Sequence, residues 1–99
     1  MDDNAKRTAD VLLDFYAGFA ASEDEQVREA AFNTALSRFN DVGAFSITMT
    51  DEHVAQVEIT PVLLATGTTT LWLVDRLAAA SNKSEEEVLF DLRQFIAKL

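Results

Sequence analysis

The chain has the hydrophobic period of a helix in four stretches and the period of a strand in one stretch between them. In the first stretch, residues 4–20, the apolar side chains form one broad stripe. The polar residues 2–4 suit the positive end of a helix dipole. The second stretch, residues 23–39, follows after a short break, which predicts an antiparallel helical hairpin. Ser22 and Glu25 have the spacing of a capping box, so we expect Ser22 to cap this helix.

Residues 44–60 alternate with period two instead. Apolar and polar positions take turns over residues 45–50 and again beyond the polar segment 50–53. This pattern, rich in β-branched residues, predicts a β-hairpin with its turn at that segment. A helix over residues 51–59 is the alternative. We prefer the hairpin, because Pro61 restricts helix extension at this point.

A third helix is predicted over residues 61–80. Thr60 is a suitable cap, and Pro61 at the first helical position loses no hydrogen bond. The predicted helix is apolar around most of its circumference, which indicates either burial or contact with a partner. Residues 67–70, Gly-Thr-Thr-Thr, are poor helix formers. We therefore expect a kink or interruption there, or a close approach of another backbone at Gly67.

The last helix begins after a break at residues 81–83, where Ser84 and Glu87 form a second capping box. An apolar stripe then runs to Leu99. The predicted fold is therefore a mostly helical α+β domain, in the order helix-helix-strand-strand-helix-helix, with one β-hairpin between two helical pairs. At this length we expect a single small domain, residues 1–99. Such a short chain buries a modest core, so self-association is expected.

Composition and charge narrow the classes of partner. Hydrophobic residues make up 48% of the chain, as in globular proteins, and the formal charge is -9. That charge disfavours nucleic acid and anionic membrane surfaces as partners. There is no cysteine, which excludes disulfides and thiolate metal sites. The charged start has no apolar signal core, and no apolar run is long enough to cross a membrane. A cytoplasmic location is the expectation.

Residues with catalytic potential do not form a recognisable constellation. His53 is the only histidine, and no second histidine or cysteine can join it at a metal. It is expected to be a solvated turn residue. Three of the four acidic clusters lie at predicted helix starts, where they favour the helix dipole. Gly67 lies in no phosphate-binding motif. We therefore predict no catalytic residue, no metal and no cofactor.

A few large apolar side chains do not fit the predicted core stripes. Trp72 lies off the narrowest stripe of the third helix, and Phe90 lies on the far side of the last one. They either fill the core or belong to an exposed patch that docks a partner or a second copy. Leu13 and Leu73 would join such a patch. These four residues are the candidate partner-binding residues.

The second half of the chain resembles small uncharacterised proteins of actinobacteria and their phages. The resemblance is carried by residues 57–64 (VEITPVLL), 71–78 (LWLVDRLA) and 84–92 (SEEEVLFDL). In those proteins a short strand leads into a helix, a break and then a Ser/Pro-Glu-Glu-Val-Leu helix. Their break usually reads Thr-Gly-Arg, whereas residues 81–83 here read Ser-Asn-Lys. The resemblance implies no activity and transfers no functional residue.

These observations predict a small acidic, non-catalytic protein-interaction module that self-associates through an apolar patch. The alternative is an acidic decoy or inhibitor, with a phage as a candidate source. Its charge of -9 would let it bind and block a basic nucleic-acid-binding protein. An enzyme is a third hypothesis, which would need a pocket that holds two carboxylates with shifted pKa values.

Overall fold

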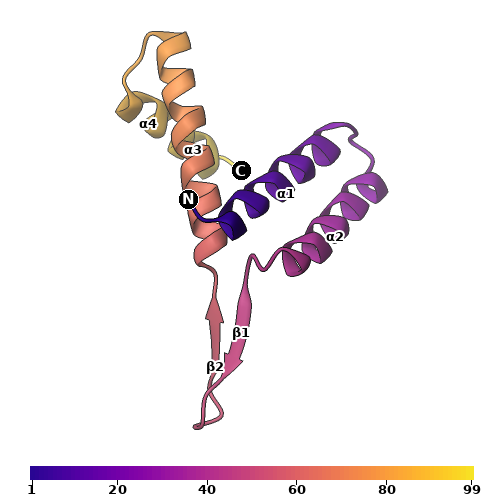
Figure 1. The fold of residues 1–99 in the computed structure, drawn as a ribbon. Helices are drawn as coiled ribbons and strands as arrows, with labels where there is room; N and C mark the ends of the chain where they lie inside the picture. Colours follow the sequence, from indigo (N-terminus) through magenta and orange to yellow (C-terminus); the bar gives the residue numbers. More distant parts are fainter. The chain divides into compact units, whose positions relative to one another are not determined.

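The computed structural model describes all 99 residues and contains four helices and a two-stranded antiparallel sheet (Figure 1). The elements, in chain order, are α1 (Asp3–Ala20), α2 (Glu25–Asp41), β1 (Ser46–Met49), β2 (Ala55–Glu58), α3 (Thr60–Ser81) and α4 (Glu85–Ala97). This order confirms the predicted α+β fold with one β-hairpin between two helical pairs. The chain divides into two compact units, unit 1 (Met1–Thr66) and unit 2 (Gly67–Leu99), which are described separately below.

The β-hairpin of unit 1 confirms the two predicted strands, and its connection covers residues 50–54. Ile47 pairs with Val57 and Met49 with Ala55, so the apolar side chains share one face of the ribbon. The alternative of a helix over residues 51–59 is therefore wrong. His53 lies in the turn with a positive φ of 60° and is exposed, as expected for a solvated turn residue.

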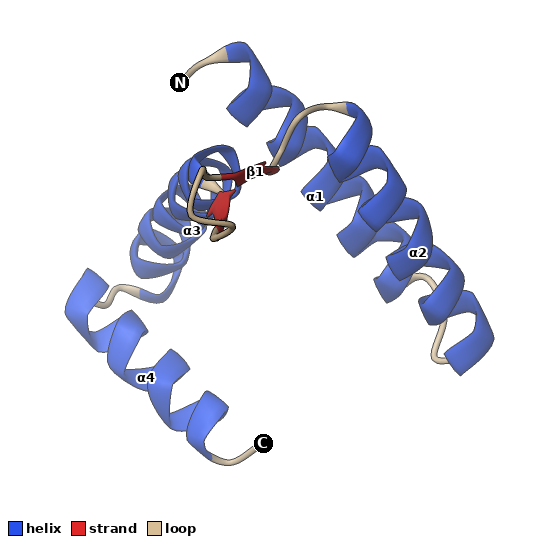
Figure 2. Cartoon of the chain, turned by 90° about the horizontal axis from the view of Figure 1, so that it is seen from below, coloured by secondary structure: helices blue, strands red, loops and turns tan.

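The helices α1 and α2 pack against each other as an antiparallel hairpin (Figures 1 and 2). Small residues permit this close approach. A Cβ atom added at Gly18 would lie 3.3 Å from the Cβ of Ala31. Larger rings close the hairpin on one side, where the centroids of Phe15 and Phe32 are 6.2 Å apart in an edge-on arrangement.

Polar contacts tie the α1–α2 hairpin at two further points. Arg38 forms an ion pair of 2.8 Å with Asp14 across the two helices. Near the connecting loop, Arg28 donates to the carbonyl oxygens of Phe19 and Ser22. Its guanidinium also lies 4.2 Å from the centroid of the Phe19 ring. The predicted helical hairpin is thus held along its whole length.

The start of α2 differs from the prediction. The carboxylate of Asp24, not the hydroxyl of Ser22, caps the helix and accepts a hydrogen bond of 2.8 Å from the Gln26 amide. Ser22 lies two residues before Asp24, and its hydroxyl accepts a hydrogen bond from the Asp24 amide. The prediction of a capping box was wrong here because the helix begins at Glu25 itself, so Glu25 is the first helical residue and not the third. At α1, Asp2 caps by accepting from the Ala5 amide.

The start of α3 also differs in detail. Thr60 is the first residue of the helix and not its cap. The Glu58 carboxylate accepts from both the Thr60 amide, at 2.7 Å, and the Thr60 hydroxyl. These hydrogen bonds favour the charged carboxylate and hold the pKa of Glu58 below its usual value. The Glu58 carboxylate therefore takes the capping role that was predicted for Thr60.

The expected interruption at residues 67–70 is absent, because α3 runs unbroken from Thr60 to Ser81. No other atom approaches the open side of Gly67 within 4 Å, so no backbone packs there. Propensity disfavours these four residues, but helix formation is cooperative, so a helix that continues on both sides includes them.

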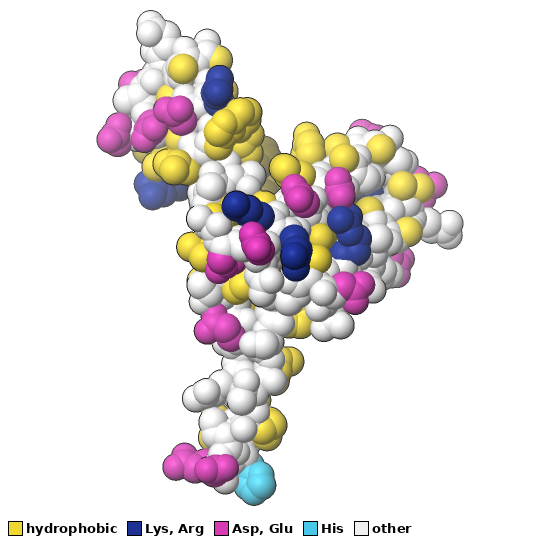
Figure 3. All heavy atoms as spheres, viewed as in Figure 1, with side chains coloured by type: hydrophobic (Ala, Val, Ile, Leu, Met, Phe, Trp, Pro, Cys, Tyr) yellow, Lys and Arg dark blue, Asp and Glu magenta, His cyan; other side chains and the backbone are white.

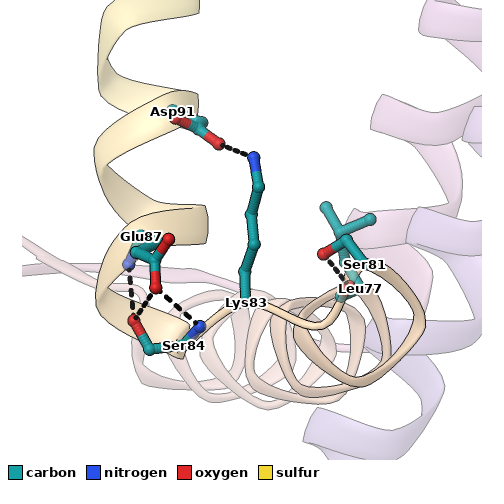
Figure 4. A network of polar contacts seen from close by, with 6 residues as sticks. All are labelled: Leu77, Ser81, Lys83, Ser84, Glu87 and Asp91. Carbon is teal, nitrogen blue, oxygen red and sulfur yellow. Dashed lines mark hydrogen bonds and ion pairs between the residues drawn. The ribbon is translucent and has the colours of Figure 1, made fainter.

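The turn between α3 and α4 has the predicted capping box (Figure 4). The Ser84 hydroxyl accepts from the Glu87 amide at 3.2 Å, and the Glu87 carboxylate accepts from the Ser84 amide at 3.3 Å. Asn82 takes a left-handed conformation with φ 56°, and the Lys83 amide donates back to the Ala78 carbonyl. This is the geometry with which helices commonly end.

Small side chains make up almost all of the buried residues. In unit 1 these are Ala5, Thr8, Val11, Ala35, Ala44 and Ala65, and in unit 2 they are Ala78 and Val88. No leucine, isoleucine, methionine or aromatic side chain is buried. In Figure 3, hydrophobic side chains lie on the visible surface among the charged ones. The apolar residues that usually stabilise a domain therefore remain in contact with solvent.

Candidate interaction surface

The two helices of unit 2 enclose an apolar groove, here called the α3–α4 groove. The helices diverge from their turn, and their backbones do not approach each other along their length (Figure 2). The open space between them has a volume of about 500 Å³. Its lining residues are Thr70, Leu73, Val74, Leu77, Ser81, Lys83, Val88, Asp91 and Leu92. Five of these nine are aliphatic, so the groove offers a surface for an apolar side chain or helix.

One end of the groove is fixed by polar contacts at the turn (Figure 4). The ammonium group of Lys83 forms an ion pair of 2.8 Å with the Asp91 carboxylate. This hydrogen bond, and secondarily the charge of the same carboxylate, raises the pKa of Lys83 above its ordinary value. The Ser81 hydroxyl donates to the Leu77 carbonyl at 2.6 Å. Because these charges and hydroxyls satisfy one another, the groove presents no unpaired ion to an apolar occupant.

The predicted partner-binding residues are all exposed, and one of them lies in the α3–α4 groove. The exposed fractions are 52% for Leu13, 57% for Trp72, 55% for Leu73 and 57% for Phe90. Only Leu73 lines the α3–α4 groove. Trp72 directly precedes Leu73 on α3, so its side chain leaves the helix about 100° away from that of Leu73. The Arg76 guanidinium lies 5.0 Å from the centroid of the Trp72 ring. Leu13 belongs to unit 1 and the other three to unit 2.

Sequence reasoning missed most of the exposed apolar side chains on α4. Phe95, Ile96 and Leu99 belong to the predicted apolar stripe of the last helix and were not among the partner-binding candidates, yet 60%, 56% and 87% of their surfaces are exposed. They continue the apolar line of the groove beyond Leu92. A regular apolar stripe indicates that one face of a helix is covered by other residues. It does not show whether those residues belong to the same chain or to a partner.

The apolar face of the β-hairpin is exposed as well. Every residue of β1 and β2 is exposed, including Ile47 at 65% and Val57 at 61%. A two-stranded ribbon is marginal without a packed face, and both of its edges are unpaired. The hairpin of unit 1 is thus a second exposed apolar surface, in addition to the α3–α4 groove of unit 2.

The polar side chains do not assemble a reactive centre. No group of three or more histidine, cysteine or acidic side chains lies close enough to hold a metal ion. No buried side-chain polar atom lacks a hydrogen-bond partner. None of the four helices combines the length and apolar character of a membrane-crossing segment. In unit 1, a smaller groove of about 260 Å³ lies between α1 and α2, with only the paired Asp14 and Arg38 as charged lining residues.

Comparisons with known proteins returned no family model, no curated protein and no solved structure that matches the chain.

Proposed function

We propose that this chain is a non-catalytic interaction module that self-associates through the apolar side chains left exposed by its helices. The observation that supports the proposal is that almost no large apolar side chain is buried. A chain with 48% hydrophobic residues buries no leucine, isoleucine, methionine or aromatic side chain. Apolar surface of this extent is rare on monomers and typical of surfaces that another protein covers.

Leu73 is the predicted partner-binding residue with the most support. It lies in the α3–α4 groove, where a partner would contact several aliphatic side chains at once. Contacts that form in a closed pocket contribute more to binding than isolated exposed side chains. Trp72, Phe90 and Leu13 lie outside the groove, and in the proposal they are further contact points for a protein partner.

The size of the native particle tests the proposal. Light scattering behind size-exclusion chromatography should give a mass of more than one 10.9 kDa chain at micromolar concentration. Leu73→Glu should return the particle to a single chain, because a carboxylate in an apolar contact loses hydration without gaining a partner. Ala79→Glu is the matched control, since Ala79 is an exposed residue of α3 outside the groove. A wild-type protein that stays a single chain at every concentration would refute self-association.

Salt separates this proposal from the acidic-decoy alternative, which the charge of -9 favours. Two copies of the same acidic chain repel each other, so added salt should strengthen their association. A decoy bound to a basic protein should instead be released as salt rises. Self-association that weakens tenfold or more between low and high salt would count against an apolar interface.

A further inference from the structure

Both helices of unit 2 carry a repeat that suits side-by-side helix packing. Residues on the groove side recur at intervals of four, three and four positions. The repeat is formed in α3 by Thr70, Val74, Leu77 and Ser81, and in α4 by Val88, Leu92 and Phe95, with Leu99 at the next position just beyond the end of the helix. This spacing is the one with which neighbouring helices interdigitate their side chains. We call these eight residues the seam.

The seam is not closed within unit 2. Its first six members line the open α3–α4 groove, while Phe95 and Leu99 lie beyond it and are exposed. A helix that entered the groove would contact both sides of the seam at once. The chain therefore presents a place for one more helix of matching periodicity.

The exposed apolar area of this part of the chain approaches what a dimer interface of standard size needs. Three large apolar side chains that line the groove and three more at the C-terminal end of the chain have 40% to 87% of their surface exposed, namely Leu73, Leu77, Leu92, Phe95, Ile96 and Leu99. At roughly 200 Å² for a large side chain, their exposed parts total about 700 Å². This value is close to the ~800 Å² that each partner contributes to an interface of standard size.

The charges along α4 favour a second α4 in the opposite direction. Its first turn carries Glu85, Glu86 and Glu87, whereas its second half carries Arg93 and ends at the cap residue Lys98. Two such helices placed antiparallel would bring each acidic start next to the basic end of the other. Parallel placement would put the acidic starts together, with like charges and like ends of the helix dipoles side by side.

We propose that the C-terminal half of α4 from a second copy of this chain fills the α3–α4 groove, antiparallel to the resident α4. Because the contact is reciprocal, each copy fills the groove of the other about a twofold axis. This inference rests on the proposed self-association and specifies its partner, its surface and its direction.

Single-cysteine cross-linking tests the direction of the helices, and the absence of native cysteine makes the result easy to assign. The variants are Glu85→Cys at the start of α4 and Lys98→Cys at its end, which are about 20 Å apart along one helix. The two proteins are co-expressed and treated with a short bismaleimide. We expect cross-linked pairs that contain one cysteine of each kind, and little cross-linking when either variant is present alone.

Two further variants locate the contact on α3. Leu77→Glu should reduce the mixed cross-link at least tenfold, because it places a charge in the seam. Ala79→Glu should leave the yield within about twofold, because Ala79 is an exposed residue of α3 that does not line the groove. Loss of the cross-link on Ala79→Glu together with its persistence on Leu77→Glu would move the contact to another face of α3 and overturn the inference.

The failures of the two proposals can be told apart. A single chain by light scattering would refute self-association, and with it the inference. A dimer that cross-links Glu85→Cys to itself, or that gives no mixed cross-link, would refute only the antiparallel docking of α4 and leave the proposed function standing.

Discussion

The two helical hairpins of this chain have the same topology but opposite packing. In unit 1, α1 and α2 contact each other closely, with Gly18 against Ala31 at the crossing. In unit 2, the backbones of α3 and α4 approach each other only at their turn, where Lys83 pairs with Asp91, and large side chains such as Leu77 line the space between them. Both pairs have apolar stripes. The difference indicates that the size of the residues along a stripe, more than its hydrophobicity, decides whether two helices of one chain can close on each other.

The largest effect is expected from filling the close crossing of unit 1. Gly18→Leu should destabilise the protein by about 1–3 kcal/mol, because the added side chain must push α2 away from α1. Gly67→Ala is the matched control in α3, where a Cβ atom meets nothing within 4 Å. It should stabilise the protein by about 0.5–1 kcal/mol, since alanine is the better helix former.

Urea unfolding followed by circular dichroism measures both changes. The comparison of the two hairpins predicts opposite signs for the two glycine substitutions. If Gly18→Leu were neutral, the crossing of α1 and α2 would not depend on small residues, and the contrast between the hairpins would need another cause.

A smaller effect is expected at the turn that holds α4. Ser84→Ala removes the hydroxyl of the capping box and should cost about 1 kcal/mol in thermal or urea unfolding. Ser22→Ala should cost clearly less, because Asp24 caps α2 and Ser22 only accepts from the Asp24 amide. Equal losses for the two variants would contradict the assignment of Asp24 as the cap.

The smallest effect is expected from pH. The Asp91 carboxylate raises the pKa of Lys83, so the charged ammonium is favoured in the folded state. The stability from this pair is fully present below the ordinary lysine pKa of about 10.4 and is lost as pH rises through the raised value. An alkaline unfolding series should therefore fall less steeply for Lys83→Met than for the wild type. Parallel curves would mean that the ion pair, which is exposed to solvent, contributes nothing measurable.

The order of elements could be predicted because the signals that define it are local. Period-two alternation identified the β-hairpin, and the box formed by Ser84 and Glu87 identified the start of α4. Two other starts were misassigned in detail, because more than one polar side chain can reach the same amides. At α2 the adjacent Asp24 caps in place of Ser22, and at α3 the Glu58 carboxylate reaches forward to Thr60.

The candidate site was only partly predictable, for a different physical reason. Trp72 and Phe90 stood out because they leave the stripes, yet neither lines the α3–α4 groove. Leu77 and Phe95 follow the stripes and were not named as candidates, but both are more than half exposed. Periodicity identifies a face that must be covered, whereas the identity of the cover depends on distances that only the three-dimensional structure supplies.

The direction of α4 depends on the left-handed backbone conformation of Asn82, just beyond the end of α3. The direction of this helix is set near its first turn, by backbone angles and by the Lys83–Asp91 pair, and beyond that turn its backbone does not approach that of α3. Its 13 residues form an arm about 20 Å long, so a rotation of about 10° at the turn moves the far end by roughly 3–4 Å. A small adjustment at one residue therefore changes the width of the groove by a few ångströms.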